Sequence, residues 1–135
     1  MQDEWVLSGR VVSGVRKGAY FTQLEWVQEQ CMEKLGFKPY PGTLNLQISE
    51  RDLSIVEALQ KEEGIELMPP DTTFCAAKAM PLSIGHVSGA IIMPDEEVRV
   101  HGKQVIEVIS PLRLKEILCV DDGDYLTLTI KKTGS

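Results

Sequence analysis

The sequence has few cysteines, no cysteine pair with metal-ligand spacing and no long apolar run. Its 135 residues include three cysteines, Cys31, Cys75 and Cys119, without a CxxC motif, so we expect free thiols in a reducing cytoplasm. No stretch of about 18 consecutive apolar residues occurs, and we therefore expect no transmembrane helix and no membrane partner. The opening residues MQDEWVLSGR lack the pattern of a signal peptide.

Positive charge is also scarce. Fourteen Lys and Arg residues stand against 20 Asp and Glu residues, which gives a formal net charge of −6. This balance argues against a general nucleic-acid binder, which would carry a basic excess or stripe. It leaves room for one small phosphorylated ligand at a local site. With 43% hydrophobic residues and no linker, residues 1–135 are predicted to form a single domain, and we expect a monomer.

Short alternating segments dominate the chain. Thr22 and Glu25 form a T-x-x-E capping box that predicts a helix stopped by Gly36. Two further helices are predicted over 50–62 and 111–118. Hydrophobic alternation and turn residues predict strands over 5–12, 43–48, 73–79, 82–85, 87–93, 97–101, 104–109 and 125–130. Many short strands with two or three short helices indicate a mainly β protein, a compact β barrel.

The segment Pro39–Asn45, PYPGTLN, is the strongest local motif. The two-residue period of a strand places Thr43 and Asn45 on one face and turns Leu44 to the core. A hydroxyl and an amide oxygen pointing the same way can share one hard cation such as Mg²⁺, which completes its shell with water and phosphate oxygens. The alternative is a pair of polar residues on a solvated strand face.

A glycine-containing segment follows the first predicted strand. Gly14 and Gly18 allow backbone N–H groups to approach a phosphate, and Arg16 with Lys17 would offset its charge. The segment is not a Walker loop, because no G-K-[ST] ending is present. An ordinary turn with a solvated Arg-Lys pair is the alternative.

Glu107 lies in the otherwise apolar run Val105–Ile109. A carboxylate in such a run either points to solvent or requires a partner. In the functional interpretation Glu107 sits in a pocket and orients or deprotonates a hydroxyl group.

Several motifs together resemble one known family. They are GRVVSG, GAYF, KLGFKPYPGTLNL, VIEVISP and the DGD turn, in this order over residues 7–131. In this combination the chain is similar to the archaeal CTP-dependent riboflavin kinases, and PYPGTLN is the most specific element. The resemblance implies a six-stranded cradle-loop β barrel that transfers the γ-phosphoryl group of CTP to the 5′-hydroxyl of riboflavin, giving FMN and CDP.

The resemblance also implies roles for individual residues. Thr43 and Asn45 would hold Mg²⁺, and Glu107 would contact the ribityl side of the flavin as the catalytic carboxylate. Arg99 stands where the family usually has a threonine near the flavin. The implied nucleotide-binding residues are Gly14, Val15, Arg16, Lys17, Gly18, Ala19, Leu112, Arg113, Leu114 and Lys115.

One segment departs from the family pattern. The family's nucleotide loop typically reads G-x-G-E-G, whereas this chain has Arg16 for the middle glycine and Lys17 for the acidic residue. A cationic loop can still bind phosphate. The alternative function is therefore a non-catalytic flavin- or nucleotide-binding module on the same barrel.

Overall fold

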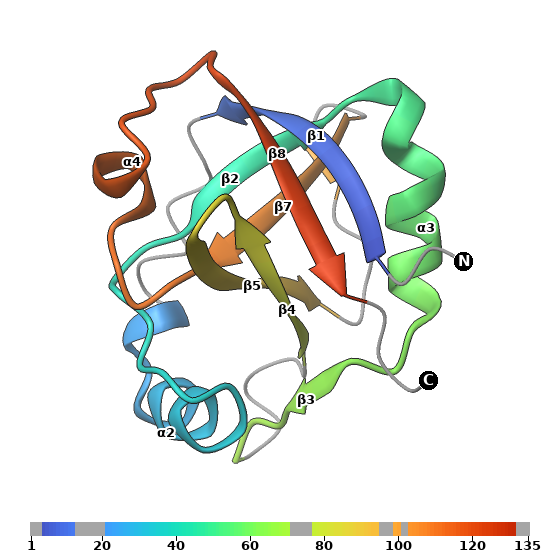
Figure 1. Cartoon of the computed structure of the whole chain (residues 1–135). Helices are drawn as coiled ribbons and strands as arrows, with labels where there is room; N and C mark the ends of the chain where they lie inside the picture. The colour runs from blue at the N-terminus through green and yellow to red at the C-terminus, as the bar shows by residue number, and fades with distance from the viewer. Residues whose placement is uncertain (1–3, 13–20, 71–76, 95–98, 101–102, 132–135) are drawn as a thin grey trace.

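Six antiparallel strands close into a barrel in the order β2-β1-β8-β4-β5-β7, and β7 pairs back with β2 (Figure 1). The computed structural model describes residues 4–12, 21–70, 77–94, 99–100 and 103–131. The barrel strands are β1 (Glu4–Val12), β2 (Leu44–Ile48), β4 (Ala77–Ile84), β5 (Val87–Pro94), β7 (Lys103–Ile109) and β8 (Tyr125–Lys131). Two short strands lie outside this ring: β3 (Ile65–Leu67) pairs with β4, and β6 (Arg99–Val100) pairs with β7. The prediction of a mainly β, six-stranded barrel is confirmed.

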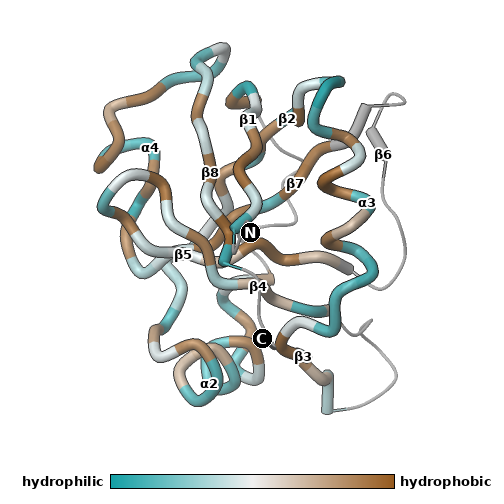
Figure 2. Tube along the Cα trace, turned by 45° about the vertical axis from the view of Figure 1, so that its right-hand side comes forward, coloured by the Kyte–Doolittle hydropathy of each residue, from teal (hydrophilic) through white to brown (hydrophobic). Residues whose placement is uncertain are grey.

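Strand alternation fills the barrel interior. In β2, Leu44, Leu46 and Ile48 are buried in the interior cluster, as the two-residue period predicts. Leu7 of β1 and Leu128 of β8 meet in the same cluster and face each other in register. Apolar and polar residues accordingly alternate along the strands of the trace (Figure 2). The interior is packed with side chains, so ligands have to bind on the outside of the barrel.

Two helices contribute side chains to the two ends of the interior. The 3₁₀ turn η1 (Glu50–Asp52) leads into α3 (Leu53–Lys61), and Val56 and Leu59 of this helix join the interior cluster. Leu114 of the short helix α4 (Leu114–Ile117) does the same from the opposite side of the barrel (Figure 1).

A third helix, α2 (Glu25–Lys34), packs against the outer face of the barrel. Its buried residues Val27 and Cys31 form a second cluster with Ala79 of β4 and Ala90 of β5. Because the alanine side chains are small, the helix can approach the strands closely. The apolar residues that the helix covers make this patch of the outer surface apolar. In the described part of the chain, no helix has the length and hydrophobicity needed to span a bilayer.

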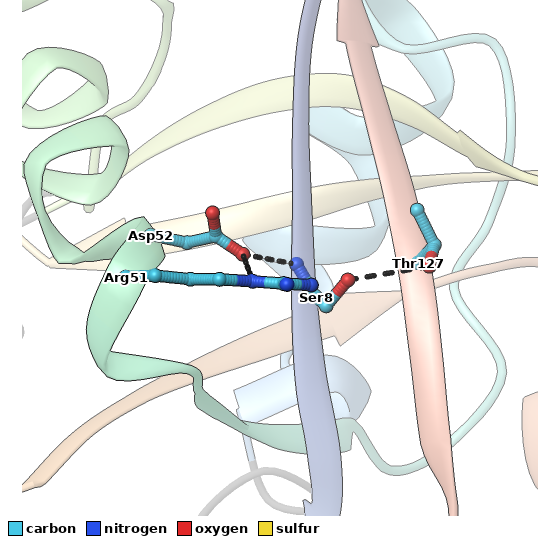
Figure 3. Close-up of polar contacts among 4 residues, drawn as sticks. All are labelled: Ser8, Arg51, Asp52 and Thr127. Atoms are coloured by element: carbon cyan, nitrogen blue, oxygen red, sulfur yellow. Dashed lines mark hydrogen bonds and ion pairs between the residues drawn. The ribbon is translucent and has the colours of Figure 1, made fainter.

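A partly buried polar contact between η1 and β1 holds η1 against the barrel. The Ser8 N–H of β1 donates to the Asp52 carboxylate at 2.9 Å, and Arg51 lies 3.8 Å from the same carboxylate (Figure 3). The Ser8 hydroxyl in turn lies 3.3 Å from the hydroxyl of Thr127 in β8. Asp52 therefore joins the start of α3 to β1.

The structure corrects several local predictions. The capping box of Thr22 and Glu25 is wrong, because residues 21–23 are helical themselves and α2 begins at Glu25 with Leu24 as its uncapped N-cap residue. The two strands predicted on either side of Pro81 are one strand, β4. Proline is tolerated because it falls between the part of β4 that pairs with β3 and the part that pairs with β8.

One further strand and one helix boundary also differ from the sequence prediction. Strand β3 was not predicted, and its three residues are too few to show a period. The helix predicted over 111–118 is limited to Leu114–Ile117, since Pro111 lies in the bend before it.

Candidate functional site

A row of outward-facing residues crosses four strands of the barrel. Asn45 of β2 faces Val12 of β1 on one side and Glu107 of β7 on the other, and Glu107 faces Ile92 of β5. The neighbours of Asn45 along β2, Leu44 and Leu46, belong to the interior cluster, so alternation turns Asn45 outward. Two polar residues that lie 62 positions apart in the sequence are thereby placed side by side.

Thr43 connects these two residues. Its hydroxyl oxygen lies 3.3 Å from the Asn45 amide oxygen Oδ1 and 3.3 Å from the Glu107 carboxylate oxygen Oε1. A hydroxyl has one proton to donate, whereas both neighbours present acceptor oxygens. This cluster of three oxygens therefore has more lone pairs than protons, and it favours a bound cation or a ligand hydroxyl that donates.

Burial makes this excess of acceptors significant. Asn45 is only 7% exposed and Glu107 is half-buried, and Ile92 beside Glu107 belongs to the apolar cluster under α2. Removal from water raises the pKa of Glu107 above the usual glutamate range, and the hydrogen bond from Thr43 lowers it in part. The sequence left open whether Glu107 points to solvent; the structure places it in a partly desolvated site.

The three side chains fit the ligand preference of Mg²⁺. Hard cations take oxygen ligands from hydroxyl, amide and carboxylate groups, and Mg²⁺ commonly keeps several ligands from water and substrate phosphates. Among the described residues no group of three or more His, Cys, Asp or Glu side chains could hold a metal ion. A cation at Thr43 and Asn45 would thus depend on oxygen atoms supplied by a substrate.

A pocket of about 220 Å³ opens beside Thr43. It lies between the turn that precedes β2 and the segment that follows β7. Its lining residues are Tyr40, Pro41, Gly42, Thr43, Leu44, Val108, Ser110, Leu112, Arg113, Leu114 and Lys115. The structure therefore brings the predicted metal ligand Thr43 together with all four residues predicted for nucleotide binding after the Ser-Pro dipeptide.

Hydrogen bonds join the two walls of the pocket. The Tyr40 N–H donates to the Ser110 carbonyl oxygen at 2.7 Å. Ser110 is 2% exposed, and its hydroxyl donates to the Ser88 carbonyl of β5 at 3.0 Å and accepts from the Leu112 N–H at 3.3 Å. Ser110 therefore fixes both walls relative to the barrel.

Two cationic side chains stand at the pocket. Lys115 Nζ lies 2.9 Å from an Asp122 carboxylate oxygen, and Arg113 lies 4.0 Å from Glu116. The Arg113 pair is largely exposed and the Lys115 pair is partly exposed to solvent, where such pairs contribute little stability. An incoming anionic ligand can therefore compete for Arg113 and Lys115 at low cost.

The other predicted site residues do not all fall in described regions. Gly14, Val15, Arg16, Lys17, Gly18 and Ala19 lie outside the described residues. The chain leaves the described structure after Val12, which faces Asn45, and returns at Phe21. Arg99 lies in β6 and pairs with Gln104 of β7.

Sequence reasoning missed several residues of the pocket. Tyr40 and Gly42 belong to the PYPGTLN motif, but nothing in the motif alone distinguishes a lining residue from a turn residue. Ser110 occurs in the sequence analysis only within the VIEVISP motif and was not predicted to contact the pocket. Its place could be inferred only from the contact between β5 and the end of β7, which is a tertiary feature.

Comparisons with known proteins show the family to which the chain is similar. The model of the CTP-dep_RFKase family, described as a domain of unknown function, DUF120, matches residues 11–130. A protein named riboflavin kinase from Archaeoglobus fulgidus is 39% identical over 92% of this chain and 54% of its own length. Proteins of the same name from Pyrobaculum islandicum and Methanosarcina barkeri are 41% and 33% identical, over 92% and 96% of this chain and 59% and 58% of their own lengths. The chain thus spans somewhat more than half the length of these relatives.

Proposed function

The chain belongs to the CTP-dep_RFKase family, and from that premise we propose that it is a riboflavin kinase that uses CTP. One observation carries the proposal: Thr43 lines the pocket shared with Leu112–Lys115 and also lies within 3.3 Å of Glu107. A phosphoryl donor in the pocket and a hydroxyl acceptor at Glu107 would meet at this residue. Relatives named riboflavin kinase support the choice of acceptor, and the family name supports CTP as the donor.

The pocket suits the phosphate end of a nucleotide. Arg113 and Lys115 supply positive charge, and the ion pairs described for them are at least partly exposed to solvent. Tyr40 and Leu112 are 44% and 48% exposed and offer apolar surface to a base or sugar. Arg16 and Lys17, which the family resemblance implies for nucleotide binding, lie outside the described residues.

Glu107 is the catalytic residue in this proposal. The oxygen of the riboflavin 5′-hydroxyl attacks the γ-phosphorus of CTP, a new O–P bond forms, and the bond from that phosphorus to the β,γ-bridging oxygen breaks. The hydroxyl proton passes to the Glu107 carboxylate, and the bridging electron pair leaves with CDP. A carboxylate with a raised pKa is a better proton acceptor near neutral pH than an ordinary one.

Positioning and charge compensation supply most of the catalysis in phosphoryl transfer. Mg²⁺ bound by Thr43 and Asn45 would offset the charge of the phosphate oxygens. The chain's own residues hold the acceptor oxygen at Glu107 and the donor against Arg113 and Lys115.

The first experiment is a chromatographic assay for FMN. The protein is incubated with riboflavin, Mg²⁺ and, in separate reactions, CTP, ATP, GTP or UTP. We expect FMN to form fastest with CTP. Faster formation with another triphosphate would contradict the donor assignment, and riboflavin or nucleotide binding without FMN would favour the non-catalytic module.

The metal assignment has its own matched pair of variants. We expect Asn45→Ala to abolish Mg²⁺-dependent turnover with the fold intact. Gln47→Ala is the control, because Gln47 lies on the same strand face, one residue pair further along β2, and faces Arg10 and Val105 instead of Glu107. An Asn45→Ala protein that keeps most of its activity would contradict the metal assignment.

Three other parts of the sequence interpretation stay predictions. They are the extent of the domain over residues 1–135, the monomeric state and the cytoplasmic location. Cys31 and Cys119 are free thiols, and Cys75 lies outside the described residues.

A further inference from the structure

The side chain of Thr22 reaches the turn that carries Thr43. Thr22 is fully buried, and its hydroxyl oxygen accepts a hydrogen bond from the Gly42 N–H at 2.8 Å. The two residues lie 20 positions apart and belong to different elements. A buried hydroxyl that holds a backbone N–H of a distant turn fixes the position of that turn, because the loss of either partner leaves a buried polar group unsatisfied.

Gly42 is the point at which this bond has most effect. It has a φ of +116°, a conformation that residues with side chains rarely adopt, and it directly precedes Thr43. The same turn is held at its other end by the bond from the Tyr40 N–H to the Ser110 carbonyl. With both ends of the turn fixed, the direction in which the Thr43 hydroxyl leaves the backbone is fixed as well.

Thr22 is itself held in place by α2. Its carbonyl oxygen accepts a hydrogen bond from the side-chain amide of Gln28 at 3.3 Å. Helix α2 packs on the outer face of the barrel through Val27 and Cys31. Thr22 therefore links α2 to the turn through two hydrogen bonds, one from Gln28 and one from Gly42. The packed helix thereby fixes where the turn lies.

We propose that Thr22 is a positioning residue for the cation bound by Thr43 and Asn45, and that it acts through Gly42. This inference rests on the proposed function for the identity of the cation.

The test compares Thr22→Val with Thr22→Ser. Valine keeps the shape but removes the hydroxyl, whereas serine keeps the hydroxyl. We expect Thr22→Val to speed amide hydrogen exchange at Gly42 and to raise the Mg²⁺ concentration for half-maximal turnover by about tenfold, as for other residues that orient metal ligands. The KM for riboflavin should change less than about twofold, and Thr22→Ser should restore both values to near wild type.

Val27→Ala separates positioning from a general loss of stability. Val27 is fully buried in the same cluster under α2 but makes no bond to the turn. We expect this variant to lower the stability and leave the Mg²⁺ dependence unchanged. A similar rise in the Mg²⁺ requirement for Val27→Ala, or failure of Thr22→Ser to restore it, would overturn the positioning role.

A second readout does not depend on catalysis. Titration of the protein with MgCl₂ in the presence of CTP, followed by the amide resonances of Thr43 and Asn45, reports cation binding even if no FMN is formed. Weaker binding in Thr22→Val with wild-type binding in Thr22→Ser would support the inference although the kinase proposal had failed. Unchanged Gly42 exchange and unchanged Mg²⁺ binding in Thr22→Val, or no response of Thr43 and Asn45 to Mg²⁺ in the wild type, would overturn it.

Discussion

A single glycine controls how closely β5 approaches β7, and Gly89→Ala tests this control. A Cβ atom added at Gly89 would lie 2.5 Å from the carbonyl oxygen of Ile109. Favourable separations between non-bonded heavy atoms begin at about 3.5 Å, so the two strands would have to move apart by about 1 Å. The obstacle is backbone, which cannot turn away as the end of a side chain can.

The expected loss of stability follows from two opposing terms. Forcing an extra methyl group into a packed region costs about 1–3 kcal/mol. Replacing glycine by alanine in a strand recovers about 0.5–1 kcal/mol of backbone entropy. We therefore expect Gly89→Ala to lower the free energy of unfolding by about 1–2 kcal/mol at 25 °C.

The same movement should reach the functional site. Ile109 is followed by Ser110, whose hydroxyl bonds to the Ser88 carbonyl and whose carbonyl holds Tyr40. Separation of β5 from β7 would strain these bonds and loosen both walls of the pocket. We expect a higher KM for the nucleotide in Gly89→Ala, with a smaller effect on the KM for riboflavin.

Urea unfolding followed by tryptophan fluorescence measures the stability, and Gly9→Ala is the matched control. A Cβ atom at Gly9 would have its nearest contacts at 3.1 Å, with Gln47 and Leu46, so its cost should be clearly smaller. The reasoning is refuted if Gly89→Ala is as stable as the wild type, or if Gly9→Ala is the more damaging of the two.

Four further predictions concern single side chains. Glu107→Gln should lower turnover at least about tenfold and remove the acid limb of the pH profile of kcat/KM. In the wild type this acid limb should lie at higher pH than an ordinary glutamate would give, because the pKa of Glu107 is raised. Unchanged kinetics in the variant would exclude a catalytic role. Burial raises the pKa of Cys31 to about 11, so iodoacetamide at pH 8 should label exposed Cys119 much faster than Cys31, as peptide mass spectrometry can show. Because the folded-state pKa of Cys31 is raised, its contribution to stability should be complete below about pH 8.5 and fall as the pH rises toward 11. Leu46→Ala, in the barrel interior, should lower the free energy of unfolding by about 2–5 kcal/mol, and a loss below about 1 kcal/mol by urea unfolding would contradict its place in the core.

Alternating strands were predictable because one of their faces is buried. The segments 43–48 and 125–130 show strict alternation, and the structure has strands at Leu44–Ile48 and Tyr125–Lys131. The prediction divided strand β4 into the segments 73–79 and 82–85, with Pro81 between them. Whether β4 tolerates a proline at position 81 depends on which strand pairs with β4 at that point. This pairing is set by the closure of the barrel rather than by local sequence.

The candidate site was predictable only as far as it depends on the alternation of side chains along a strand. Strand parity placed Thr43 and Asn45 on one face from the sequence alone. The residues left two environments open for Glu107, because the outer face of a strand is usually solvated. What decides between them is the register that sets Asn45 opposite Glu107 and the apolar cluster beside Ile92, and both are long-range features.

Thr22 shows the opposite case, in which a local pattern was real but its explanation was wrong. Threonine followed three residues later by glutamate fits a capping box. The hydroxyl instead bonds to Gly42, and the residues around it are already helical. A threonine in either role has the same local sequence, so only the position of the distant turn can separate them.

The location of the site follows from how the barrel is filled. Side chains from the six strands occupy the interior, and Val56 and Leu114 reach it from α3 and α4, so polar chemistry is confined to outward-facing positions. Most outward positions are solvated and would leave a carboxylate with an ordinary pKa. The row through Asn45 and Glu107 differs because the cluster under α2 limits it on one side and the 40–43 turn on the other. A shift of β2 or β7 by one residue would turn these polar groups into the interior, so the register that stabilises the core also determines the site.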